Sequence, residues 1–149
     1  MYGRVVALYD GSVHADRALE AATQIAKRFD SELIVLTVVP IRPSFGEVPG
    51  YPAKAEEREI EGYRTAVERA ADRAKKAGAH RVHAEVREGG VVEEILTYLE
   101  AHPPDLVLVG DRGQSTSRRL MLGSVSEALV HHAPCPVLVE KKRRPATRQ

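Results

Sequence analysis

The 149-residue chain has one cysteine, no tryptophan and no long apolar run. A lone cysteine, Cys135, excludes an internal disulfide and is typical of the reducing cytosol. No stretch approaches the roughly 18 apolar residues of a membrane span. A strand pattern begins almost at the first residue and leaves no room for a signal peptide. We therefore expect a cytoplasmic protein that has no membrane partner.

A dominant charge is also lacking. Lys and Arg total 22 against 21 Asp and Glu, a formal charge of +1. This balance gives no reason to expect a nucleic-acid partner, because proteins that bind nucleic acids carry strongly basic surfaces. Residues 142–149 are the exception, a basic stretch without periodicity that we expect to be a disordered, solvated tail rather than a nucleic-acid arm. Residues 1–141 suit one domain.

Apolar runs alternate with helical patterns along residues 1–141. Continuous apolar runs are typical of parallel strands covered on both faces, whereas alternation with charged residues suits a sheet edge. The pattern predicts an α/β three-layer sandwich with a five-stranded parallel sheet. Strands are expected at 5–8, 33–39, 106–109 and 136–140, with a half-exposed edge strand at 82–86. Helices are expected over 13–29 with Ser12 as the cap, over 53–77 with Gly78 as the stop, and over 92–102 and 124–132. Residues 41–52, rich in Pro and Gly, are expected to form a mobile lid.

A glycine pattern follows the strand at 106–109. It reads Gly-x-x-Gly, nine residues, then Gly-Ser, at Gly110, Gly113, Gly123 and Ser124. Glycines let backbone N–H groups approach phosphate oxygens, and the N–H groups of a helix start point at the negative charge. The Walker and dinucleotide patterns are absent. The stretch predicts the phosphate-holding part of a nucleotide site; the alternative is a strand-end turn followed by an ordinary helix cap. Ser124 to Glu127 reads as a capping box.

With these residues the chain resembles the nucleotide-binding branch of the universal stress protein family. Val5–Ser12 is similar to the opening strand and turn of that family, and Ala133–Val139 to its closing strand. The resemblance implies the strand order 3-2-1-4-5. In that order Asp10 and Gly110 end the two strands that flank the topological switch point, where ligands of such folds bind.

The resemblance implies a ligand and roles for site residues. The ligand is ATP, with ADP and AMP as alternatives and Mg²⁺ as an optional companion ion. Asp10 would accept hydrogen bonds from the ribose, and Leu8 and Val38 would form the adenine wall. Backbone N–H groups and the serine hydroxyl would hold ribose and phosphates at Gly110, Gly113, Gly123, Ser124 and Val125. Arg112, Arg118 and Arg119 would either add positive charge or stay solvated.

One position departs from the commonest family pattern. Asp111 stands where a small hydroxyl residue is frequent. A carboxylate in a phosphate loop repels the ligand unless it points outward or meets a metal ion.

We find no catalytic constellation in the sequence. Ser12, His14 and Asp10 lie in one turn without the geometry of a triad, and the adjacent His131 and His132 face different sides of a helix. We expect an ATP-binding regulator in the stress response. A slow ATPase or self-phosphorylating enzyme and a nucleotide-free dimeric interaction module stay open as alternatives.

The resemblance also implies a homodimer formed through the last strand, Pro136 to Val139. An apolar strand at the edge of a sheet is exposed unless another chain pairs with it, so elementary physics also predicts a homodimer through this strand.

Overall fold

We describe the protein from a computed structural model, which describes residues 1–41, 53–112 and 123–144. Strands and helices alternate through these residues, as the apolar runs predict. The elements are β1 (Arg4–Leu8), α1 (Val13–Phe29), β2 (Glu32–Pro40), α2 (Ala53–Lys76), β3 (Arg81–Gly89), α3 (Val91–Ala101), β4 (Leu106–Gly110), α4 (Ser124–His132) and β5 (Val137–Glu140).

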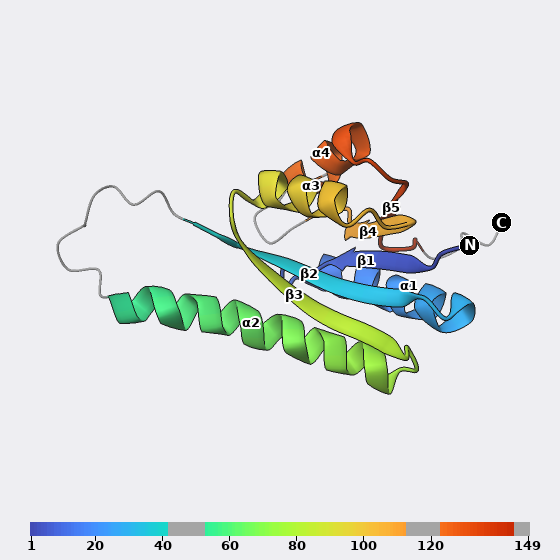
Figure 1. Cartoon of the computed structure of the whole chain (residues 1–149), viewed down its shortest axis with the longest axis horizontal. Helices are drawn as coiled ribbons and strands as arrows, with labels where there is room; N and C mark the ends of the chain where they lie inside the picture. The colour runs from blue at the N-terminus through green and yellow to red at the C-terminus, as the bar shows by residue number, and fades with distance from the viewer. Residues whose placement is uncertain (42–52, 113–122, 145–149) are drawn as a thin grey trace.

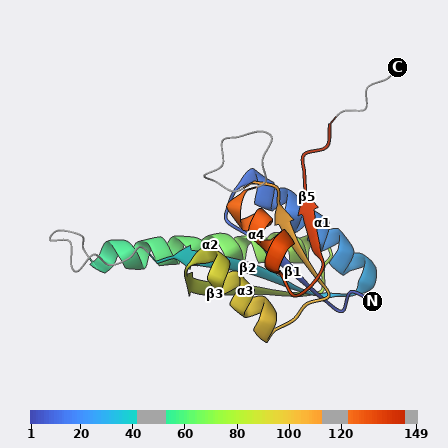
Figure 2. The same cartoon turned by 90° about the horizontal axis from the view of Figure 1, so that it is seen from above.

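The strands form a parallel sheet in the order β3-β2-β1-β4-β5. This confirms the predicted fold and strand order. Helices α1 and α2 cover one face and α3 and α4 the other (Figure 1), and Figure 2 gives the same arrangement from above. Side chains alternate between the faces, so the strands supply two separate cores. Val5 and Ala7 of β1 belong to the core under α1 and α2, whereas Val6 and Leu8 belong to the one under α3 and α4.

Local signals fix the start of α1 and the end of α2 where the sequence predicts. The Ser12 hydroxyl accepts the N–H of Ala15 at 3.1 Å and caps α1. Gly78 follows α2 at φ +114°, a conformation that side-chain-bearing residues rarely adopt. These short-range interactions explain why the two boundaries can be located from the sequence.

The capping box predicted at Ser124 is wrong. The N-cap of α4 is Gly123, and no side chain caps the helix. Ser126 instead donates its hydroxyl to the carbonyl oxygens of Gly123 at 2.9 Å and Asp111 at 3.3 Å. The Gly123 N–H also donates to the Asp111 carbonyl at 2.7 Å. These hydrogen bonds to the carbonyl of Asp111, which follows β4, fix the start of the helix. Asp111 is more than ten residues away, so a local motif such as the capping box does not include it.

Several predictions concern residues outside the described ranges. They are the mobile lid over 41–52, of which only Ile41 is described, the site residue Gly113, the two arginines Arg118 and Arg119, and the disordered tail over 142–149, which is described only to residue 144. Residues 141–144 are exposed and lie in no helix or strand. Within the described ranges, the helices lack the combination of length and apolar character needed to cross a membrane.

Candidate functional site

A cavity of about 450 Å³ lies where β1 and β4 end and their connections diverge to opposite faces of the sheet. Every predicted site residue except Gly113, which is outside the described ranges, lines it. These residues are Leu8, Asp10, Val38, Gly110, Gly123, Ser124 and Val125. The switch-point rule and the glycine pattern therefore lead to one place.

One part of the cavity is apolar. Leu36 and Val38 of β2 face Val91 and Ile95 of α3 there, and all four belong to the core beneath α3 and α4 or pack against it. Side chains anchored in a core move little, so this wall is preformed. A flat apolar group, such as the ring system of a base, suits it.

The other part of the cavity is polar and lies at the start of α4. Gly123, Ser124 and Val125 line it with the first turn of a nine-residue helix. First-turn N–H groups have no acceptor within their own helix, and the helix dipole adds partial positive charge. Asp10 lies on the β1 side, where its Oδ1 accepts the N–H of Ser12 at 2.9 Å. An anion near α4 and a hydroxyl-bearing group near Asp10 match this polarity.

Gly110 has a packing role that the sequence does not reveal. A Cβ at this position would lie 2.7 Å from both the carbonyl carbon and the oxygen of His14, and 2.9 Å from the His14 Cβ. The N-terminal turn of α1 therefore contacts the end of β4 directly. Glycine is required here by the approach of α1, whatever binds in the cavity.

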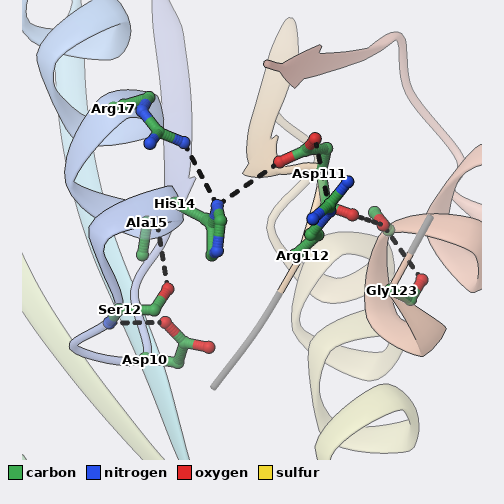
Figure 3. A network of polar contacts seen from close by, with 9 residues as sticks. Asp10, Ser12, His14, Ala15, Arg17, Asp111, Arg112 and Gly123 are labelled. Atoms are coloured by element: carbon green, nitrogen blue, oxygen red, sulfur yellow. Dashed lines mark hydrogen bonds and ion pairs between the residues drawn. The ribbon is translucent and has the colours of Figure 1, made fainter. Parts of the chain in front are cut away.

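The Asp111 carboxylate points away from the cavity. Asp111 is not among the lining residues, and its Oδ1 lies 3.6 Å from the Nδ1 of His14 on α1 (Figure 3). Arg17 approaches the same ring nitrogen at 3.1 Å. The carboxylate therefore points outward, which reduces its repulsion of a phosphate in the cavity.

Tyr9 and Tyr63 also line the cavity, and no sequence pattern predicts a role for them there. The Tyr9 hydroxyl donates to Asp16 at 3.0 Å and accepts from Arg73 at 3.0 Å, which ties the end of β1 to both helices beneath the sheet. Burial raises the pKa of Tyr9 above its ordinary value, so it stays a neutral hydrogen-bonding group. Tyr63 comes from α2, and no local signal separates it from other half-buried helical residues.

Cys135 and the histidines offer no second reactive centre. Burial raises the pKa of the Cys135 thiol and disfavours its thiolate form. His80, His83, His102, His131 and His132 are exposed. Among the described residues, no group of three or more His, Cys, Asp or Glu side chains is arranged to hold a metal ion.

The described residues form a doubly wound α/β fold with a cavity at the switch point. The family model described as "Universal stress protein family" matches residues 1–141. The chain therefore belongs to the universal stress protein family.

Individual relatives agree with this assignment. A universal stress protein of Methanocaldococcus jannaschii is 34% identical over 143 residues, which cover 95% of this chain and 84% of the relative. The solved structure of universal stress protein UspA from Lactobacillus plantarum is 27% identical, with a TM-score of 0.82 over 93% of this chain and 97% of its own. A crystal structure of a universal stress protein in complex with cAMP is 28% identical, with a TM-score of 0.70 over 94% of this chain and 97% of its own.

Proposed function

We propose that this protein binds an adenine nucleotide, with ATP as the expected ligand, in the switch-point cavity and acts as a nucleotide-dependent regulator in the stress response. The proposal depends on one observation: an apolar wall and the start of a helix line the same cavity. The apolar wall suits a base, and the helix start suits a phosphate. The cAMP complex of a 28% identical relative supports a nucleotide ligand.

The proposed pose follows from the polarity of the cavity. The base lies between Val38 and the apolar residues of α3, and the ribose hydroxyls donate to Asp10. The phosphates meet the first turn of α4 at the N–H groups of Ser124 and Val125, because the Gly123 N–H already donates to the Asp111 carbonyl. Asp10 is the one carboxylate in the described lining, so Mg²⁺ would fit only as an ion shared between this side chain and the phosphates.

A matched pair of valine substitutions tests the binding site. Val91→Trp fills the apolar wall from the start of α3, whereas Val130→Trp adds the same bulk at an exposed position on α4. We expect calorimetric titration with ATP, ADP and AMP to give at least a tenfold loss of affinity in Val91→Trp, because the base loses its space. Val130→Trp should bind as the wild type does.

Two outcomes would contradict the proposal. They are an absence of adenine-nucleotide affinity below the millimolar range in the wild type, and equal affinity in both variants. Mass spectrometry of the purified protein should also find a co-purified adenine nucleotide.

Phosphate release that exceeds trace contamination and is abolished by Asp10→Ala would favour the enzyme alternative.

We also propose a homodimer formed through β5. This strand pairs with β4 and, within the described residues, with no other strand. Val137, Leu138 and Val139 are half-buried in the single chain. Unpaired backbone groups and partly covered apolar side chains at a sheet edge favour pairing with a second copy.

The cytoplasmic location expected from the single cysteine stays a prediction.

Sedimentation velocity tests the dimer. The wild type should sediment as a dimer, and Val139→Lys should shift it toward monomer because a charge would be placed in the interface. Val130→Lys, at an exposed position on α4, should leave the dimer intact. A wild-type protein that sediments only as a monomer would refute the proposal.

A further inference from the structure

The described lining of the cavity contains two side chains that are charged at neutral pH. Asp10 lies on the β1 side, and Arg112 follows the end of β4. The Arg112 side chain is 21% exposed, so much of it is withdrawn from solvent. In Figure 3 it lies between Asp111 and Gly123, the N-cap of α4. A guanidinium in this place can add to the positive potential of the helix start.

Asp111 is held rigidly beside Arg112. Its N–H donates to the carbonyl of Glu140 on β5 at 3.1 Å, and its carbonyl accepts from Gly123 and Ser126. Its carboxylate is 17% exposed, and Oδ2 lies 3.9 Å from the Nε of Arg112. A carboxylate this close, and shielded from water, cancels part of the attraction that Arg112 exerts on an anion.

His14 is the group that can offset the Asp111 charge. Oδ1 of Asp111 is buried, has no hydrogen-bond partner among the described residues, and lies 3.6 Å from the Nδ1 of His14. When Nδ1 lacks a proton it can accept from Arg17 at 3.1 Å, but it offers nothing to Asp111. When both ring nitrogens are protonated, the ring carries a positive charge next to the carboxylate, and the Nδ1–H can donate to it. The charged residues Arg17 on α1 and Asp111 after β4 contact His14. Helix α1 also packs against β5, which ends at Glu140.

We propose that Arg112 selects for the phosphate of the bound nucleotide, and that Asp111 weakens this selection until a proton on His14 offsets its charge. The inference rests on the proposed function and names the side chains that distinguish a nucleotide from its nucleoside. Affinity for phosphate is then higher when the His14 ring is charged than when it is neutral. Affinity for the base and ribose does not depend on the ring charge in this way.

The first experiment compares adenosine with cAMP by calorimetry at fixed pH. Arg112→Gln should weaken cAMP binding about tenfold to a hundredfold, the usual effect of removing a charge-assisted hydrogen bond. Adenosine binding should change by less than about twofold. Arg112→Lys should recover part of the loss. Arg64→Gln removes an arginine on α2 that is 49% exposed and outside the lining, and it should change neither affinity.

The second experiment follows cAMP binding between pH 8 and pH 5.5, because a phosphodiester keeps a single negative charge throughout. Wild-type affinity for cAMP relative to adenosine should rise several-fold as the pH falls. His14→Gln should abolish the rise. Asp111→Asn should bind cAMP several-fold more tightly at pH 8, because the charge that opposes Arg112 is gone. His83→Gln, an exposed histidine on β3, should behave like the wild type.

The outcomes separate this inference from the proposed function. A wild type that binds neither adenosine nor cAMP ends both. A wild type that binds both ligands, with a cAMP-to-adenosine ratio unchanged in Arg112→Gln, ends only the inference. If cAMP affinity in His14→Gln depends on pH as it does in the wild type, the proposed role of Asp111 and His14 is refuted. Thermal unfolding shows which variants are folded, and His14→Gln decides the question if Asp111→Asn does not fold.

Discussion

Gly110→Ala should lower the free energy of unfolding by about 2–3 kcal/mol or more, the usual cost of forcing a methyl group into a packed interior. The new Cβ would lie 2.7 Å from the His14 carbonyl, and backbone atoms cannot move aside as the end of a flexible side chain can. The melting temperature should fall by about 5–10 °C for a domain of this size. Chemical and thermal unfolding measure both quantities.

Gly62→Ala is the matched control for this substitution. Gly62 lies inside α2, is exposed, and has no atom within 4 Å of the position of an added Cβ. Alanine at such a site should stabilise the protein by about 0.5–1 kcal/mol, because it reduces the backbone entropy lost on folding. The two glycine-to-alanine changes should therefore have opposite signs. A shift of the same sign and size at both positions would contradict the close approach of α1 to Gly110.

Asp10→Asn should weaken nucleotide binding about tenfold to a hundredfold while leaving the fold nearly as stable as the wild type. The amide oxygen of Asn can still accept the Ser12 N–H that Asp10 accepts at 2.9 Å. The substitution removes the negative charge and replaces the second acceptor oxygen with a donor. A hydrogen bond to a charged group contributes about 1.5–3 kcal/mol, which gives the expected loss of affinity.

Asp10→Ala separates binding from stability. It removes the acceptor of the Ser12 N–H as well, so it should also destabilise the turn before α1 by about 1 kcal/mol. Calorimetric titration and unfolding of the two variants together test the prediction. Wild-type affinity in Asp10→Asn would show that this carboxylate does not contact the ribose.

The order and type of the secondary-structure elements follow from the sequence alone. Buried parallel strands need unbroken apolar runs such as Val5 to Leu8. Ser12 caps the start of α1 and Gly78 follows the end of α2, and both act through contacts within a few residues. The general location of the cavity also follows, once the family resemblance supplies the strand order. The type and ends of the elements depend on local periodicity or local hydrogen bonds, so a linear sequence contains them, whereas the strand order comes from the resemblance.

The tertiary structure alone determines how the cavity is built. It shows that Gly110 is needed for the approach of α1, that Ser126 rather than Ser124 bonds the backbone at the start of α4, and that Asp111 points toward His14. It also brings Tyr63 of α2 into the lining. The partners in these contacts are distant in sequence, and their distances and directions depend on how whole helices pack on the sheet. No pattern in the neighbouring residues specifies them.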